Sequence, residues 1–498
     1  MNYPYPANVY AHFLSTPVEE HLIDTQRQAA ASHVVDLFHR TVAKVPAYRD
    51  FLSVKGISPD SVRTHADFCR LPLMTKDGYV RAYPLTQRCR DAKITHADTV
   101  AVSSGSTGNP TVWPRNVEDE LGVAYEFERI LKWSFAAHQR STLAVICFAL
   151  GTWVGGFYTA AVCRYLAQKG FALTVVTPGN NVAEILRILP ELAPEFDQIV
   201  LFGYPPFLKT VVDAGIAANI RWADFNTKMV FAGEVISETW RKLMTDRVEG
   251  PDVLHTTASM YGTADAGVIA AETPLSIAIR RYLADHSETA KTIFGESRLP
   301  TLVQYNPRSR FLETYDDTLV VTCDGVAPLI RYHIADKGGI INFDAMMALL
   351  REAGCDPAIH FKAVLNATRV ALPFAYVFGR ADFTVSYFGA NVYPENIAVG
   401  LEQDEFKDAL TGKFVLEVGT ADDGNAELQL TVELASNTEA DLNLAAAIRE
   451  SVRAHVCRLN SEFANYVPAE RQYPTVNLRP YGDPKWFPIG VKHRYTRK

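Results

Sequence analysis

A run of serine, threonine and glycine residues directly follows a short apolar segment near residue 100. Glycine lets backbone N–H groups approach phosphate oxygens closely, and hydroxyl groups add donors, so such a loop can hold the anionic end of a nucleotide. No Lys-Ser or Lys-Thr pair closes it, so it is not a Walker loop. A loop of this composition is also common as a plain flexible connection. The candidate phosphate-binding residues are Ser103, Ser104, Gly105, Ser106, Thr107 and Gly108.

Further strings follow this loop along the chain. In order, they are FAGE at 231–234, MYGTAD at 260–265, LIRYHIAD at 329–336, GRADFTVSYFGANVYPENI at 379–397 and FPIGVKHRY at 487–495. Together with the loop, and with LPLMTKDGYVRAYPL at 71–85, they resemble the adenylate-forming superfamily of acyl-CoA synthetases, and within it the phenylacetate-CoA ligase-like branch. A set of motifs that follows the order of the family over nearly the whole chain is a far more specific sign of that family than any single motif.

The resemblance implies nucleotide-binding roles for residues of the central strings. Asp336 would hold the ribose hydroxyls, a task that suits a carboxylate because it accepts two hydrogen bonds at once. Tyr261, with Gly262 beside it, would lie near adenine, and Gly233 with Glu234 would line the purine pocket. From the residue types alone, each is equally compatible with ordinary core or turn.

The resemblance also implies a metal ligand, two catalytic residues and a hinge. Asp265 stands where the family usually has Glu near Mg²⁺, a hard cation that prefers oxygen ligands. Arg380 would meet the phosphates, and Asp382 would be the hinge residue that absorbs a domain rotation. Lys492 would meet the acyl carboxylate and the α-phosphate during adenylation. Without the family, Arg380 and Asp382 could form an interdomain salt bridge and Lys492 could be a solvated tail lysine.

The implied activity is activation of a carboxylic acid with ATP and Mg²⁺ to an acyl-adenylate, followed by thioester formation with coenzyme A. Transfer to a carrier protein or an amine is an alternative. A degenerate nucleotide-binding regulatory protein is another, because Asn109 and Asp265 depart from the family pattern, as does Ala335, where Gly or Arg is usual.

Aromatic residues gather in one strand-turn-helix segment that would border the acid. Phe148, Trp153 and Phe157 would form this wall, which suits an aromatic or aryl-acetic acid. Aromatic side chains in such a segment are also frequent in an ordinary core.

These residues need a large α/β scaffold with a second, smaller part. Short apolar strands at 171–177, 198–203, 228–234 and 318–323 alternate with helical segments, which predicts a mainly parallel sheet within an α/β body over residues 1–378. Strict alternation at 427–434 and a following helix predict a small, mobile α+β domain over residues 379–498. Residues 337–378 form a longer linker than the family usually has, with a helical pattern at its start.

Composition excludes several other classes of protein. Hydrophobic residues are 48% of the chain and charged residues 21%, as in a globular protein, and the net charge of -7 offers no basic face for nucleic acid. The uncharged segment 141–163 is interrupted by glycines and is expected to be buried rather than membrane-spanning. The seven cysteines show no metal-binding spacing, and the first thirty residues lack a signal-peptide pattern, so a cytoplasmic location is expected.

Overall fold

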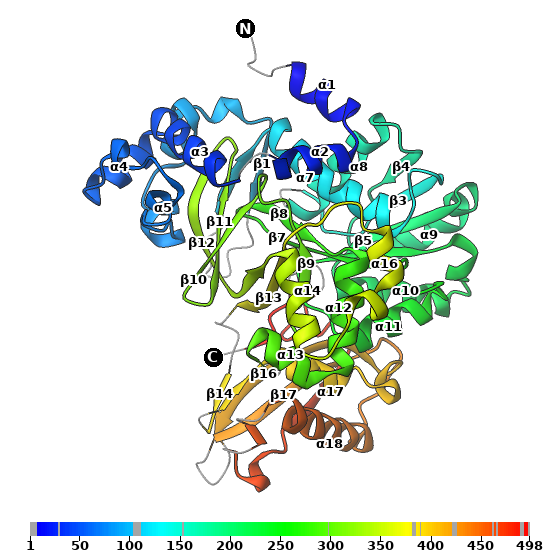
Figure 1. Cartoon of the computed structure of the whole chain (residues 1–498). Helices are drawn as coiled ribbons and strands as arrows, with labels where there is room; N and C mark the ends of the chain where they lie inside the picture. Colours follow the sequence, from blue (N-terminus) through cyan, green and yellow to red (C-terminus); the bar gives the residue numbers. More distant parts are fainter. Residues whose placement is uncertain are drawn as a thin grey trace.

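One large sheet forms the centre of the body (Figure 1). The computed structural model describes residues 7–27, 30–102, 111–151, 154–296, 298–380, 385–388, 390–420, 426–460, 463–464, 467–488 and 493–496. Within these ranges, 11 strands pair in the order β10-β11-β12-β13-β9-β8-β7-β6-β5-β3-β4. Their bounds are β3 Thr142–Ile146, β4 Leu173–Val176, β5 Gln198–Gly203, β6 Lys228–Ala232, β7 Thr257–Thr263, β8 Gly267–Ala271, β9 Thr301–Gln304, β10 Phe311–Tyr315, β11 Thr318–Cys323, β12 Leu329–Ile341 and β13 Phe374–Arg380.

Only half of this sheet is parallel. Strands β3 to β7 pair in parallel, as the alternation of strands and helices predicts, whereas β7 to β13 pair antiparallel. The prediction was wrong for 318–323, which pairs antiparallel with β10. The reason is a two-residue turn in which Asp316 and Asp317 have φ of 48° and 56°, the conformation that joins adjacent antiparallel strands.

Alternating side chains of the parallel strands feed two separate cores. In β3, Leu143 and Val145 pack with the helices α9, α10 and α11, while Ala144 and Ile146 pack with α7 and α8 on the opposite face. The sheet is therefore covered on both faces, as parallel strands require. The helices of these two layers are α7 Val117–Arg129, α8 Val154–Gln168, α9 Val182–Leu192, α10 Pro205–Ala217 and α11 Glu238–Arg247.

The N-terminal helices begin and end where the sequence signals predict. Helix α3 ends at Lys44, and Pro46 starts α4 because its fixed φ and missing N–H suit a first helical position. Asn116 caps α7 through a capping box with Asp119. The helices before the sheet are α1 Ala7–Ser15, α2 Val18–Arg27, α3 Ala30–Lys44, α4 Pro46–Val54, α5 His65–Phe68 and α6 Leu85–Arg88.

The linker between β12 and β13 folds into three helices that pack with two earlier helices in one layer. The side chains of Met346, Met347 and Leu350 join a buried cluster with Leu275, Ile279 and Phe374, so this layer supports β13. The elements of the layer are α12 Pro274–Asp285, α13 Ser287–Phe294, α14 Phe343–Glu352, α15 Pro357–His360 and α16 Lys362–Ala367.

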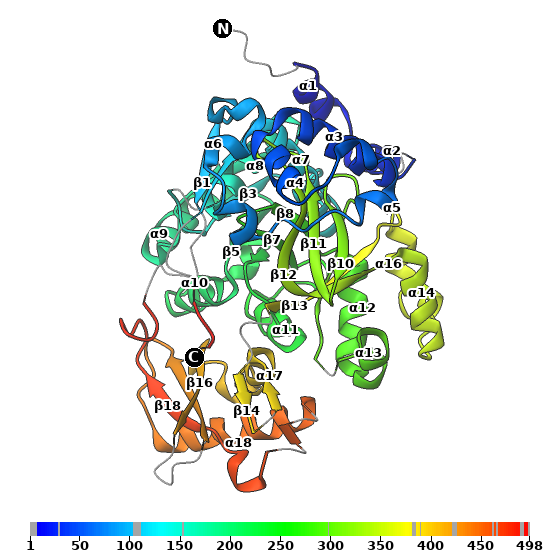
Figure 2. The same cartoon turned by 90° about the vertical axis from the view of Figure 1, so that its left-hand side faces the viewer.

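The C-terminal residues form a second core around a three-stranded sheet, β16-β17-β18 (Figure 2). The strand and helix predicted from the alternation at 427–434 are confirmed: β17 pairs antiparallel with β16, and α18 packs its Ile448, Val452 and Val456 against them. The elements here are β14 Val385–Tyr387, β15 Ala390–Val392, α17 Pro394–Leu401, β16 Leu410–Thr420, β17 Ala426–Leu434, α18 Leu442–Leu459 and β18 Thr475–Arg479.

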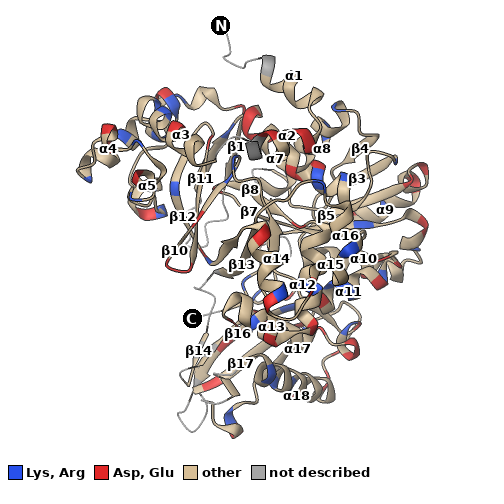
Figure 3. Ribbon diagram, in the orientation of Figure 1, with Lys and Arg blue, Asp and Glu red and all other residues tan. Residues whose placement is uncertain are grey.

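Charges of both signs are interspersed along surface helices such as α3 (Figure 3). None of the helices in the described ranges has the length and apolarity that a membrane crossing requires.

A buried lysine joins the body to the C-terminal part. The Nζ of Lys209, on α10, donates to Asp213 at 2.6 Å and to the carbonyl oxygens of Lys407 and Leu410, each at 2.9 Å. The side chain of Lys209 is 4% exposed, so its ammonium exchanges water for three protein acceptors. Two of these acceptors exist only while the two parts are docked.

We predict that Lys209→Met loosens this docking. Hydrogen bonds from a charged donor contribute about 1.5–3 kcal/mol each. Amide hydrogen exchange over residues 405–412 should therefore accelerate about tenfold or more in the variant, whereas exchange in the strands β3 and β5 should stay as slow as in the wild type. Hydrogen exchange followed by mass spectrometry measures both regions. Lys242→Met is the matched control, because Lys242 also pairs with an Asp four residues on but is exposed. Equal exchange in the two variants would contradict the role of Lys209.

Candidate functional site

Some of the expected site residues lie outside the described residues. These are Ser103, Ser104, Gly105, Ser106, Thr107, Gly108, Trp153, Asp382 and Lys492; for Arg380 only the backbone is described. The strands that flank the candidate phosphate loop are described, however. Strand β1, Thr99–Val102, pairs antiparallel with β2, Val112–Arg115, and Val102 lies opposite Val112. The two ends of the loop are therefore held side by side.

Two strands that are not neighbours in the sheet are joined at the centre of the site. The hydroxyl of Tyr261, on β7, donates to Asp336 Oδ2 on β12 at 2.7 Å. Asp336 is 8% exposed and lies opposite Arg380 in the β12–β13 register. The structure thus brings together three residues that the sequence analysis assigned to the nucleotide, although they lie on three strands.

A second tyrosine makes the reciprocal contact. The hydroxyl of Tyr332, on β12, donates to Asp265 Oδ2 at 2.5 Å, in the turn that follows β7. Strand β7 therefore supplies a tyrosine to a carboxylate on β12, and β12 supplies a tyrosine to a carboxylate just after β7. We call these two hydrogen bonds the paired Tyr–Asp contacts.

The strands carry bulges beside these residues. The β7–β8 pairing shifts register between Tyr261 and Gly262, and the β12–β13 pairing shifts between Lys337 and Gly338. A bulge bends a strand and re-aims its side chains. Next to Asp336, Ala335 has a φ of 64°, a left-handed conformation that is costly for a residue with a Cβ. The backbone is therefore distorted on both sides of the site.

Asp265 fits a magnesium ion only if a ligand supplies most of the coordination. Within the described residues, no group of three or more His, Cys, Asp or Glu side chains could hold a metal. Magnesium bound to a nucleotide typically takes one or two carboxylates and the phosphates rather than a full protein cage. A single carboxylate at this position therefore suits Mg²⁺ that arrives with a nucleotide.

The turn after β6 has a packing reason for its glycine. Gly233 has a φ of 90°, and a Cβ on it would lie 2.6 Å from the Tyr204 ring. The Tyr204 ring in turn contacts Phe148 edge to face, with centroids 5.2 Å apart. Phe148 is 2% exposed, so this part of the expected aromatic wall is well packed.

Phe157 lies in different surroundings. It is 53% exposed and borders a small cavity that it shares with Arg115, Tyr158 and residues of β1. Phe148 and Phe157 therefore line different surfaces, and the acid-binding roles given to them stay predictions.

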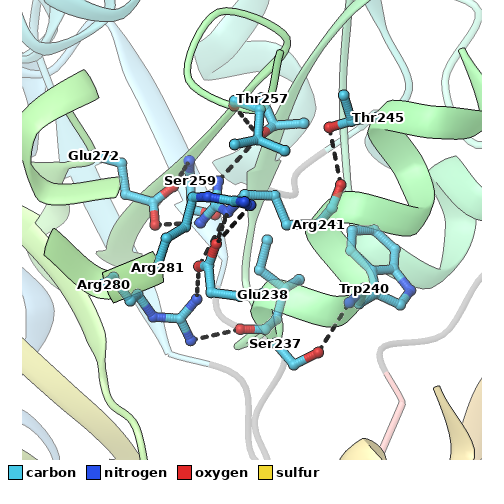
Figure 4. A network of polar contacts seen from close by, with 12 residues as sticks. Ser237, Glu238, Trp240, Arg241, Thr245, Thr257, Ser259, Glu272, Arg280 and Arg281 are labelled. Atoms are coloured by element: carbon cyan, nitrogen blue, oxygen red, sulfur yellow. Dashed lines mark hydrogen bonds and ion pairs between the residues drawn. The ribbon is translucent and has the colours of Figure 1, made fainter. Parts of the chain in front are cut away.

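A buried ionic network joins α11 and α12 to strand β7 and to Glu272 after β8 (Figure 4). Arg241 donates to Glu272 Oε1 at 2.6 Å, and Glu272 Oε2 accepts from the backbone N–H of Ser259 on β7 at 2.7 Å. Arg280 pairs with Glu238 and donates to the carbonyl of Ile236 at 2.6 Å. Because a guanidinium is a rigid planar donor, this network fixes the backbone that follows Glu234 and the neighbouring strand β7.

The C-terminal part reaches the same region. The hydroxyl of Tyr495 donates to Glu234 Oε2 at 2.6 Å, and burial together with Glu234 raises the pKa of Tyr495. The hydroxyl of Ser237, which caps α11, donates to Glu402. Glu234, assigned from the sequence to the purine pocket, thus also contacts the C-terminal residues.

Sequence reasoning missed three tyrosines that shape the site: Tyr332, Tyr204 and Tyr495. Tyr332 had a detectable signal, because it lies in the string LIRYHIAD four residues before Asp336. Residues at that spacing share a strand face. Tyr204 and Tyr495 meet Gly233 and Glu234 only through tertiary packing.

We predict that docking of the C-terminal part depends on pH through Glu402. Burial raises the pKa of this carboxyl from 4.5 to about 7, although Ser237 and Arg280 act in the opposite direction. Between pH 4.5 and about 7, Glu402 therefore holds a proton in the docked state that it loses when it is exposed to water. The stability of the docked state falls as the pH rises through this window.

Glu402→Gln should remove this dependence because the amide stays neutral. We compare the Tm of the variant with that of the wild type at each pH. The variant should gain about 1–2 °C or more relative to the wild type when the pH is raised from 5 to 8. Calorimetry over this range measures the difference. Glu405→Gln is the control, since Glu405 is exposed in the same segment. Parallel Tm curves for wild type and Glu402→Gln would rule out the effect.

Comparison with curated proteins agrees with the resemblance seen in the motifs. No family model matches the chain. Phenylacetate-coenzyme A ligase of Aromatoleum evansii is 23% identical over 237 residues, which are 47% of this chain and 50% of that protein. The chain thus spans about half the length of this curated relative in the match.

Solved structures match over the whole chain. 2-Hydroxyisobutyryl-CoA ligase in the postadenylation state, in complex with R3-HIB-AMP, has a TM-score of 0.68 at 14% identity and covers 100% of this chain and 94% of its own. The same ligase in the thioesterification state, with 2-HIB-AMP and CoA, has a TM-score of 0.53 at 16% identity with the same coverage. The chain has the fold of the adenylate-forming acyl-CoA ligases, and its sequence resembles the phenylacetate-CoA ligase-like branch.

Proposed function

We propose that this chain is an AMP-forming acid–thiol ligase that activates a carboxylic acid with ATP and transfers the acyl group to coenzyme A. The observation that carries the proposal is the pair of Tyr–Asp contacts, which hold two carboxylates, Asp336 on β12 and Asp265 after β7, each against a tyrosine of the other strand. The fold match to a ligase solved with an acyl-AMP and CoA supports it.

The first step is attack of the acid's carboxylate oxygen on the α-phosphorus of ATP. A P–O bond forms, the bond to the departing phosphate breaks, and pyrophosphate leaves. Asp336 accepts hydrogen bonds from the ribose hydroxyls, while loop residues 103–108, Arg380 and Lys492 donate to the phosphates and stabilise the charge that develops. Asp265 would hold a nucleotide-bound Mg²⁺, which neutralises phosphate charge when bound.

The second step is attack of the coenzyme A thiolate on the acyl carbonyl carbon. A thioester forms and AMP leaves with the electron pair of the broken bond. We propose that residues 379–498 turn on the body between the two steps, with Asp382 at the hinge. The higher TM-score against the postadenylation form than against the thioesterification form of the same ligase supports an orientation like the former for this chain.

The acid is proposed to be a small molecule, either an aromatic or an aryl-acetic acid. The expected cytoplasmic location of the protein stays a prediction. The curated match is to a ligase for phenylacetate and the solved match to one for a hydroxy acid. Phe148 and Trp153 are the residues proposed to contact the acid, and Phe157 is proposed to lie at the rim.

The experiment that tests the activity measures pyrophosphate release with ATP, Mg²⁺ and a panel of acids that includes phenylacetate and 2-hydroxyisobutyrate. Release that depends on the acid, followed by a thioester when coenzyme A is added, is the expected result. Acid-dependent release without a thioester would instead favour a carrier protein or an amine as acceptor. ATP binding without release for any acid would favour a regulatory nucleotide-binding protein.

We predict that Asp336→Asn weakens ATP binding about tenfold to a hundredfold and leaves acid binding unchanged. The reason is that a hydrogen bond to a charged acceptor contributes about 1.5–3 kcal/mol. Calorimetry with each ligand measures this. Asp317→Asn, in the exposed β10–β11 turn, is the control. An unchanged ATP affinity in a folded Asp336→Asn variant would remove Asp336 from the site.

A further inference from the structure

We propose that Arg115 is a positioning residue that fixes the turn carrying Asp265 and ties it to strand β2. This inference rests on the proposed function. Arg115 is the last residue of β2, the strand that leads out of the loop. Its Nη2 donates to the carbonyl oxygen of Ala264 at 2.8 Å and to that of Asp265 at 3.3 Å.

A second buried arginine holds the next carbonyl. Arg310 donates through Nε to Ala266 O at 3.0 Å, so two arginines hold three successive carbonyls of the β7–β8 turn. Arg115 is 7% exposed and Arg310 is 6% exposed. Charged donors shielded from water form stronger hydrogen bonds than exposed ones, so this turn has little freedom to shift.

Two guanidinium groups converge on the end of the turn. A Cβ on Gly267, whose φ is 72°, would lie 3.5 Å from both Arg115 Nη1 and Arg310 Nη2. Two guanidinium groups this close repel each other unless a negative charge is near. Asp119 supplies it: burial raises the pKa of its carboxyl to about 6, while both arginines favour the ionised form.

The consequence for Asp265 follows from its short side chain. An aspartate has one methylene, so the place of its carboxylate is set largely by its backbone. The arginines fix that backbone, and Tyr332 fixes the carboxylate by donating to Oδ2 at 2.5 Å. Oδ1 is then the oxygen that can be offered to a cation. Groups that orient a metal ligand in this way commonly change metal affinity about tenfold to a hundredfold when removed.

A purely structural role is the alternative, because Arg115 also stacks over the Tyr158 ring of α8 at 5.7 Å. The two roles differ in what they predict for metal binding. If Arg115 only holds α8 against β2, its loss would lower stability and leave the metal affinity of the folded protein unchanged.

The test is a titration of the full-length protein with Mn²⁺ and α,β-methylene-ATP, an analogue that cannot form the adenylate, followed by electron paramagnetic resonance. Arg115→Lys keeps the charge, but the lysine side chain is shorter and its ammonium lacks the fixed planar geometry of a guanidinium. We expect it to weaken Mn²⁺ binding about tenfold or more, with analogue affinity in the absence of metal unchanged. Tyr332→Phe should weaken Mn²⁺ binding in the same direction.

Arg129→Lys is the matched control, since Arg129 is also buried and donates to a backbone carbonyl, that of Gln304 at 2.8 Å. It should keep wild-type Mn²⁺ affinity. Arg115→Lys combined with Asp265→Asn should bind Mn²⁺ no more weakly than Asp265→Asn alone, because both act through one ligand.

Wild-type Mn²⁺ affinity in folded Arg115→Lys, or additive losses in the double variant, would overturn the inference. Should Arg115→Lys fail to fold, Arg310→Lys and Tyr332→Phe decide it by the same titration. The metal titration needs no turnover and can therefore be separated from the ligase activity. If the wild-type protein binds Mn²⁺ with the analogue but releases no pyrophosphate, the ligase proposal is wrong and the inference about Arg115 still stands.

Discussion

The paired Tyr–Asp contacts impose the main geometric constraint on this molecule. Strand β12 is separated from β7 by β13, β9 and β8 in the sheet. With neighbouring strands about 4.8 Å apart, a flat sheet would place them about 19 Å from each other. Hydrogen bonds of 2.7 Å and 2.5 Å therefore require the antiparallel half of the sheet to curl back on the parallel half. The bulges at Tyr261–Gly262 and Lys337–Gly338 are where the strands bend.

Buried arginines recur at the turns around this edge, where they bond backbone carbonyls more than they pair with acids. Arg115, Arg310 and Arg280 each donate to carbonyl oxygens of a loop next to the sheet. Buried ionic groups are weak sources of net stability, since removing them from water is costly. Their consistent effect here is geometric, because a planar donor holds a turn in one place. The network of Figure 4 and the Arg115–Arg310 pair thus serve one purpose at two neighbouring turns.

The contact between the body and the C-terminal part has another character. It includes the hydrogen bonds of Lys209, Glu234 with Tyr495, and Ser237 with Glu402, along with ion pairs such as Arg247 with Asp408. Each part meanwhile has a hydrophobic cluster of its own. The described contacts named here are therefore polar, whereas each part keeps its own apolar core.

Local signals in the sequence predicted much of the scaffold. The capping residue Asn116, the proline at 46 and the alternation in β17 act within a few residues of themselves, so the helices and the hairpin could be predicted directly. The order of the motifs also indicated which segments belong to the site. The turn at Asp316 and Asp317 is an equally local signal, but the alternation of strands and helices favoured a parallel sheet. β11 was therefore predicted to lie parallel to its neighbours, whereas it is antiparallel to β10.

Tertiary structure alone decided which of these residues meet. Tyr332 with Asp265, Tyr204 with Gly233, and Tyr495 with Glu234 join positions that are 67, 29 and 261 residues apart. No periodicity in the sequence encodes such distances, because they depend on how far the sheet curls and on where the C-terminal core docks. Both are set by the summed packing of many side chains. The residue types therefore predict a chemistry for the candidate site, whereas only the fold determines its geometry.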